Sequence, residues 1–277
     1  MYSAKLFSII TGMAIVLTAL SSSQSIAQTY WARTYGGIND EEAYAIRQTS
    51  DGGYVVAGYT GSSGAGAQDF WMLKLDTDGA AQWEGTYGGS DNDVVNSIQL
   101  TGDGGYIVAG YTGAYPYYDA WVLKLDVNGT VQWEKAYGGV NVDKIMNIQT
   151  TNDGGYIAFG YTSSYGAGSF DQLLLKLDAS GTVQWVKSYG GSGPDMGYSI
   201  QQTSDGGFIM AGNINTATNG LDFVVHKIDA GGNSHWKKNL VEARGKWLNP
   251  SSRQPMTGLS SRDLPAPMEP ALMMSGW

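Results

Sequence analysis

The chain has 277 residues, among them 40 Gly, 18 Tyr, 9 Trp and no Cys, and its 25 acidic against 16 basic side chains give a formal charge of −9. A chain without Cys has no disulfides, no thiol nucleophile and no Cys-ligated zinc. The acidic excess argues against nucleic-acid binding, which needs clustered Lys and Arg, and the many aromatic residues argue against disorder.

The first element along the chain has the features of an export signal. Lys5 supplies a short positive region, residues 6–20 are uncharged and mostly apolar, and the small residues Ser25 and Ala27 fit a cleavage site before Gln28. This apolar stretch of 15 residues is too short for a helix across a bilayer core of about 30 Å. The sequence therefore predicts a signal peptide over 1–27 and a secreted chain, extracellular or periplasmic, with no membrane span after cleavage.

Most of the remaining chain is one unit that recurs. Five Trp residues lie 52, 50, 52 and 51 residues apart, at Trp31, Trp83, Trp133, Trp185 and Trp236. An Asp-Gly-Gly triplet returns at Asp51, Asp103, Asp153 and Asp205, and a Tyr-Gly-Gly triplet begins at Tyr35, Tyr87, Tyr137 and Tyr189. A period near 50 residues is typical of β-propellers and related repeat arrays.

Within one repeat, four strands are expected in chain order, over 43–49, 54–60, 70–75 and 81–87. Asp-Gly turns follow the first and third strands, because Gly tolerates the positive φ that such hairpin turns need. The second and third strands are apolar on both faces, so neighbouring sheets must cover them on both sides. The more polar fourth strand suits an outer edge.

A four-stranded unit of this length, repeated around an axis, is a propeller blade. We therefore predict an all-β propeller of four blades of about 51 residues, near 31–82, 83–132, 133–184 and 185–240. The fourth blade has an outer strand of its own, so the segment 31–35 is a surplus outer strand that its own blade leaves unpaired.

The motifs Asp-Gly-Gly-Tyr, Leu-Lys-Leu-Asp, Gln-Trp and Tyr-Gly-Gly recur over residues 31–240. In these motifs the chain resembles bacterial secreted propeller repeats of the SBBP kind and, more loosely, PQQ-type and kelch propellers. The resemblance implies a propeller fold and export. It implies no particular activity, because propellers host many unrelated functions.

Residues 241–277 break the pattern, because neither Tyr-Gly-Gly nor Asp-Gly-Gly follows Trp236. One interpretation is a solvated tail. The other is a fifth blade translated out of frame: a two-nucleotide shift permits Gly-Gly across 241–243 and forces Asp at Met256, 20 residues after Trp236, where each earlier repeat has its Asp. The second interpretation predicts a truncated propeller and leaves open a product without function.

Alternating strand direction places the loops after strands two and four on one rim of the propeller. Each blade contributes there an acid five residues before an Ile of its first strand, namely Glu41, Asp93, Asp143 and Asp195. A second acid opens each third strand, at Asp69, Asp119, Asp171 and Asp222. Such carboxylates either bind a hard cation at the channel mouth or cap their own loops through bonds to the backbone, and recurrence in every blade favours capping.

No catalytic residue and no cofactor are predicted. The two His residues, His226 and His235, replace Leu and Gln of other repeats, which indicates structural substitutions rather than catalytic bases. The Asp-x-Asp-Gly stretch that begins at Asp76 lacks the Glu that closes a calcium loop, since Tyr87 stands at the twelfth position. This stretch therefore predicts a turn.

The variable loops of the rim carry aromatic residues expected to give specificity, Tyr115, Tyr117, Tyr118 and Tyr165. Tyr offers a flat apolar face with a polar tip, which suits carbohydrate or peptide surfaces. We expect a secreted, non-enzymatic binding or scaffold module that takes carbohydrate or protein at the cell surface through these Tyr residues and the first set of rim acids. The alternative is a propeller enzyme, a hydrolase, lyase or quinoprotein relative with a site at the channel mouth, and the scarcity of His and Arg on the rim counts against it.

Overall fold

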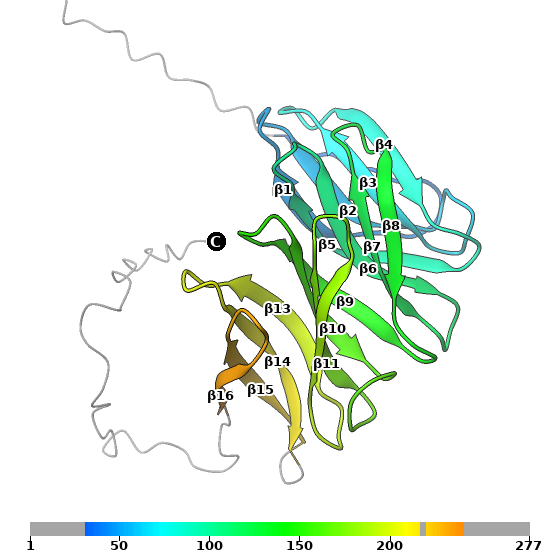
Figure 1. Ribbon diagram of the computed structural model, residues 1–277. Coiled ribbons are helices and arrows are strands. Elements are labelled where there is room, and N and C mark those ends of the chain that lie inside the picture. The colour runs from blue at the N-terminus through cyan, green and yellow to red at the C-terminus, as the bar shows by residue number, and fades with distance from the viewer. Residues whose placement is uncertain (1–30, 217–219, 241–277) are drawn as a thin grey trace, which may run out of the picture. The chain divides into compact units, whose positions relative to one another are not determined.

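The computed structural model describes residues 31–216 and 220–240, and every regular element in these ranges is a β-strand. The strands pair in chain order into four antiparallel sheets of four strands each (Figure 1). The predicted signal peptide and the off-pattern tail lie outside the described residues.

The four sheets confirm the predicted number of blades and of strands in each blade. The first comprises β1 (Glu41–Gln48), β2 (Tyr54–Thr60), β3 (Asp69–Leu75) and β4 (Ala81–Tyr87). The second comprises β5 (Asn92–Leu100), β6 (Tyr106–Gly113), β7 (Asp119–Leu125) and β8 (Val131–Tyr137). The third comprises β9 (Asp143–Thr150), β10 (Tyr156–Thr162), β11 (Asp171–Leu177) and β12 (Val183–Tyr189). The fourth comprises β13 (Met196–Gln202), β14 (Phe208–Thr216), β15 (Gly220–Ile228) and β16 (Ser234–Leu240).

These bounds confirm the four-strand repeat, with one difference at the first strand. β1 begins at Glu41 rather than at residue 43, because its first two residues pair with Thr60 and Tyr59 of β2. The ladder then skips Tyr44, and β5, β9 and β13 skip one residue at the same place. A bulge of this kind bends a strand and increases its twist. The sequence at the start of the strand does not predict the bulge.

The first strands of consecutive blades lie against one another, β1 with β5, β5 with β9 and β9 with β13. The fourth strands β4, β8 and β12 lie at the outside, where exposed side chains alternate with half-buried ones. No comparable contact joins β1 with β13, so the blades described form an open arc and not a closed ring (Figure 1). The fold is therefore all-β, with four propeller blades.

The apolar core lies between blades. Ile98 of β5 is fully buried in a cluster with Val55, Phe70 and Met72 of the first blade. Clusters at the next two junctions repeat this arrangement. Because these clusters combine side chains of two blades, each blade depends on its neighbour to bury its apolar surface. Burial of one such side chain contributes about 1.5–3 kcal/mol.

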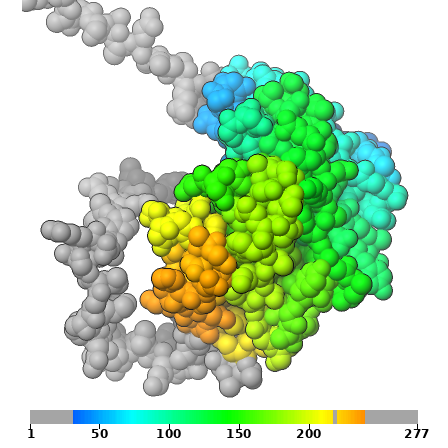
Figure 2. All heavy atoms as spheres, in the orientation of Figure 1, coloured from blue at the N-terminus to red at the C-terminus, as the bar shows by residue number. Residues whose placement is uncertain are grey.

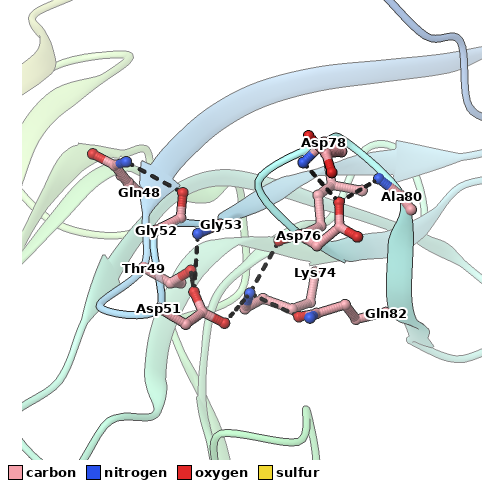
Figure 3. A network of polar contacts seen from close by, with 11 residues as sticks. Gln48, Thr49, Asp51, Gly52, Gly53, Lys74, Asp76, Asp78, Ala80 and Gln82 are labelled. Carbon is pink, nitrogen blue, oxygen red and sulfur yellow. Dashed lines mark hydrogen bonds and ion pairs between the residues drawn. The ribbon is translucent and has the colours of Figure 1, made fainter. Parts of the chain in front are cut away.

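The Asp-Gly-Gly, Leu-Lys-Leu-Asp and Gln-Trp motifs meet in one polar cluster in each of the first two blades, and Figure 3 shows the cluster of the first blade. In the first blade the Lys74 ammonium lies 2.8 Å from Asp51 Oδ2, and it donates to Gln82 Oε1 at 2.9 Å and to the Leu75 carbonyl at 3.0 Å. Lys74 is only 4% exposed. The same ion pair recurs in the other blades, between Lys124 and Asp103, Lys176 and Asp153, and Lys227 and Asp205. These recurrent polar residues therefore hold the strands of one blade together.

The stretch that begins at Asp76 is a turn, as predicted. The Asp76 carboxylate accepts hydrogen bonds from the amides of Asp78 and Ala80 at 2.9 and 2.8 Å (Figure 3). Gly79 follows with a φ of +74°, a conformation that L side chains rarely adopt. The carboxylate thus caps its own turn.

Candidate functional site: a tyrosine-lined rim

The loops after strands two and four meet on one rim, as the strand alternation predicts. The Asp93 amide at the start of the second blade donates to the Gln68 carbonyl of the first blade at 2.7 Å. The amides of Asp143 and Asp195 make the matching bonds to Tyr118 and Phe170, at 2.6 and 2.7 Å. Each junction between blades therefore begins at a rim acid.

The rim acids at Asp93, Asp143 and Asp195 are fully buried. Their Oδ2 atoms accept hydrogen bonds from the second Gly amide of the preceding Tyr-Gly-Gly, at 2.8, 2.9 and 2.7 Å. Glu41, which is less buried, accepts one from Gly37 at 3.1 Å. The capping interpretation accounts for these bonds. No group of three or more His, Cys, Asp or Glu side chains arranged for a metal ion occurs within 31–216 and 220–240.

Of the acids assigned to the start of the third strands, Asp69, Asp171 and Asp222 are buried and Asp119 is half-buried. The Asp69 carboxylate accepts hydrogen bonds from the Ala65 and Gly66 amides at 3.2 and 3.1 Å. Burial raises the pKa of Asp93, and the neighbouring Asp69 carboxylate adds to the rise. The Oδ1 atoms of Asp93 and Asp143 have no hydrogen-bond partner among the residues that the structure describes. Asp69 and the buried acids of the first set accept hydrogen bonds from backbone amides of the rim loops. A ligand-binding role for the rim acids stays a prediction.

Tyr118, one of the predicted loop aromatics, belongs to a cluster on this rim. Its ring meets the Tyr111 ring of β6 edge-on, with centroids 5.1 Å apart. The Lys144 ammonium from β9 lies 3.5 Å from the Tyr111 centroid and 4.2 Å from the Tyr118 centroid. We call these three residues the Tyr–Lys cluster. It joins the second blade to the third, and sequence reasoning had selected only Tyr118.

Lys144 is a partly buried ammonium with no counter-ion in the described part of the chain. The four lysine–aspartate ion pairs there use other lysines. Burial lowers the pKa of Lys144 to about 8, while the electron-rich faces of two Tyr rings attract the charged form. The cluster therefore presents a cation with unused N–H donors beside two aromatic faces.

Other Tyr residues extend this rim. Tyr59 in the first blade and Tyr161 in the third occupy the register of Tyr111. Tyr44 lies 6.1 Å from Tyr59 between ring centroids and donates to Glu42 Oε2 at 2.6 Å. A recurrent Gly-Tyr-Thr at the end of each second strand in the first three repeats was the available sequence signal.

The remaining predicted aromatics differ in exposure. Tyr115 and Tyr117, in the loop before β7, are 83% and 63% exposed. Tyr165 is 48% exposed and donates to the Gly138 carbonyl at 2.6 Å, which ties its loop to the preceding one. Tyr115, Tyr117 and Tyr118 therefore lie on one loop, with the first two facing solvent and the third in the Tyr–Lys cluster.

The opposite rim carries a groove of about 770 Å³ between the second and third blades. Lys124, Asp103 and Gln132 line it, together with turn residues. The polar groups of the first two are already used in the ion pair of their blade. The charged residues of this groove therefore serve the fold of their own blade, whereas the Lys144 ammonium has no ion-pair partner among the described residues.

His226 is a core residue, as its repeat position indicates. It is 3% exposed, packs edge-on against Tyr189 and lies 2.8 Å from Ser234 Oγ through Nε2. Its Nδ1 has no hydrogen-bond partner within 31–216 and 220–240, so no acid in these ranges orients the ring as in a serine–histidine–aspartate triad. Burial lowers the pKa of His226.

The described ranges contain no helix that could span a bilayer.

No protein-family model and no curated protein matches the sequence, but solved structures match in fold. The Pan2 WD40 domain of Neurospora crassa aligns with a TM-score of 0.42 at 12% identity, over 71% of this chain and 65% of that one, so this chain spans less than two thirds of it. An endo-arabinase from Bacteroides thetaiotaomicron aligns at 0.44 and 11% identity, over 73% and 81%. An endo-1,5-α-L-arabinanase from Thermotoga petrophila aligns at 0.41 and 14% identity, over 70% and 57%. These likenesses extend to the fold and not to an activity.

Proposed function

We propose that the chain is a secreted, non-enzymatic propeller that binds a carboxylate-bearing saccharide at the Tyr–Lys cluster. The observation that carries the proposal is the position of the Lys144 ammonium, 3.5 and 4.2 Å from two Tyr ring centroids and without a carboxylate partner among the described residues. Apart from these two rings, no described residue pairs with the ammonium as a counter-ion or accepts a hydrogen bond from it.

A carboxylate is the ligand group that fits Lys144 best. The ammonium has three N–H donors and no acceptor, and partial burial has removed some of the water that would otherwise accept from them. A hydrogen bond between an ammonium and a carboxylate is shorter and about twice as strong as one between neutral groups. A ligand carboxylate would therefore replace the hydrogen bonds to water that the Lys144 ammonium loses on burial.

A sugar ring fits the surroundings of the carboxylate. Tyr115 and Tyr117 leave most of their surface exposed on the loop that carries Tyr118. Their rings offer flat apolar faces, and their hydroxyls can donate and accept. The net charge of −9 opposes an anionic ligand at long range, but salt at physiological strength screens this repulsion beyond about 8 Å.

The test is a glycan array that pairs uronic-acid oligosaccharides with neutral oligosaccharides of the same linkage and length. We expect the full chain to bind members of the uronate set and to ignore their neutral counterparts. Lys144→Met should remove this binding, because Met keeps the contact with both rings but lacks the charge. The matched control is Lys135→Met, since Lys135 lies 5.9 Å from the Trp133 ring on an outer strand. Absence of uronate binding, or equal binding of the neutral set, would refute the proposal.

A further inference from the structure

The junction between blades occurs three times in the chain, and each end of the arc carries one half of it. In the first junction the Phe70 ring of the first blade packs against Trp121 of the second, with centroids 4.7 Å apart. Phe70 is fully buried and Trp121 is 8% exposed. The blade before a junction thus supplies a side chain from its third strand, and the blade after it supplies a receiving surface.

The first blade has the receiving surface, but no blade among the described residues covers it. Trp71 occupies the register of Trp121, since both stand two residues after the start of a third strand. A hollow of about 120 Å³ lies here, lined among others by Trp71, Ala43 and Val56. Ile46 is 56% exposed, whereas Ile98 at the same register of the second blade is fully buried. The missing cover is therefore a blade on this side.

The fourth blade has the matching donor surface. Phe223 of β15 occupies the register of Phe70, since each follows the Asp of the Asp-x-x-x-x-Lys pattern that recurs in the third strand of every blade. It is 47% exposed, where Phe70 is fully buried. The two surfaces lie at opposite ends of the arc, with the first blade in blue and cyan and the fourth in yellow and orange (Figure 2). They cannot meet within one chain as the blades are arranged.

We propose that the fourth blade of one copy docks on the first blade of a second copy, with Phe223 against Trp71 of that copy, as Phe70 packs against Trp121. The contact continues an interface that the chain already forms at three junctions. It is head-to-tail, and such contacts either close into a ring or extend into a filament. Two copies close with eight blades, which is within the usual range of about 4–8 for propellers, whereas three would need twelve.

The segment 31–35 competes with this contact. Tyr87 of the first blade donates to the Gly129 carbonyl of the next blade at 2.7 Å, and Tyr35 donates in the same way to the Gly79 carbonyl of the first blade. Trp31 also donates to the Thr77 carbonyl, at 3.0 Å. The segment thus occupies the position of a preceding outer strand, although it pairs with no strand. β16 of a second copy needs this position, so residues 31–35 must leave it when two copies join.

The experiment is sedimentation velocity of the full chain over a range of concentrations. We expect a reversible species of two copies, and Trp31→Ala with Tyr35→Ala should strengthen association because the competing segment is weakened. Phe223→Glu and Trp71→Ala should each raise the dissociation constant by about 10-fold or more, as loss of a central aromatic contact does. Val140→Glu is the control, since Val140 is 80% exposed in a rim loop.

Mixing separates loss of the interface from misfolding. Phe223→Glu keeps an intact first blade and Trp71→Ala an intact fourth blade, so an equimolar mixture retains one intact junction and should form a two-copy species that neither variant forms alone. A full chain that stays monomeric with residues 31–35 weakened overturns the proposal. So does association that appears only after removal of residues 241–277, because the tail would then be the occupant of the end face. A mixture that fails to associate overturns it as well.

Discussion

The Lys124 ammonium lies 2.8 Å from Asp103 Oδ2, and Lys124 is 5% exposed while the Asp103 side chain is half-exposed. This bond to Lys124 holds the pKa of Asp103 at about 2, below its unfolded value of about 3.9. A lowered carboxyl pKa stabilises the fold above the unfolded pKa, and the contribution is lost as pH falls through the folded one. Solvent screens the half-exposed Asp103 carboxylate, so Asp103→Asn should cost about 1 kcal/mol at pH 7, mainly because Lys124 stays buried without its partner.

Urea unfolding at pH 7 and near pH 2 checks this dependence. The difference between the parent chain and Asp103→Asn should shrink toward pH 2, because Asp103 is then protonated in the unfolded parent and partly protonated in the folded one. Asp78→Asn is the control, since Asp78 is exposed and forms none of the four ion pairs. An equal difference at both pH values would contradict the ion-pair account.

Ile46 and Ile98 provide a matched pair for the energetics of the blade junction. Ile98→Ala leaves a cavity in a packed cluster and should cost about 2–4 kcal/mol. Ile46→Ala, at the same register of the end blade, should cost less than about 1 kcal/mol. Denaturant unfolding at concentrations where the chain is monomeric measures both. Similar values would mean that the first blade is covered in solution.

The outer-strand Tyr hydroxyls fix each blade to the turn of the next. Tyr137 donates to the Gly181 carbonyl at 2.6 Å and is partly buried, so Tyr137→Phe should cost about 1 kcal/mol. Tyr117→Phe, which alters a 63% exposed side chain, should change the unfolding free energy by less than about 0.5 kcal/mol. Thermal unfolding of the two variants decides whether the hydroxyl contributes.

Binding at the Tyr–Lys cluster should depend on pH through Lys144. Burial lowers the pKa of this lysine to about 8, so the ammonium is lost above that value while a ligand carboxylate stays ionised. Affinity for a uronate should then fall by up to about tenfold per pH unit above 8. Lys144→Arg should bind without this decline, because guanidinium keeps its charge. Calorimetric titrations between pH 7 and 10 test both statements, and a flat profile for the parent chain would exclude Lys144.

The repeat made most of the fold predictable. In the first repeat, Gly-containing turns and the apolar pattern of the middle strands predicted β2, β3 and β4 at their observed bounds or within a residue of them. The cluster of Lys74, Asp51 and Gln82 was not foreseen, because its members come from different parts of one blade and only pairing of the strands brings them together. The bulge at Tyr44 was likewise invisible, since it depends on register.

The site was harder to predict. Capping by the rim acids was one of two interpretations of their recurrence, and the bonds from Gly89 and its counterparts agree with it. Tyr111 was missed because it recurs within a strand, where it resembles a packing residue. Lys144 replaces the Glu42, Val94 and Met196 of the other blades. Departure from the repeat, rather than recurrence, was therefore the sequence signal for Lys144.

In the proposed division of roles, recurrent residues stabilise the blades, whereas the non-recurrent Lys144 binds the ligand. The direct test compares Lys144→Met with Lys124→Met by measuring the affinity for the best-bound uronate of the array and the free energy of unfolding. We predict that Lys144→Met loses binding with its stability intact, and that Lys124→Met loses about 1–3 kcal/mol of stability with its affinity intact. Retained binding in Lys144→Met, or equal loss of affinity in both variants, would contradict the claim.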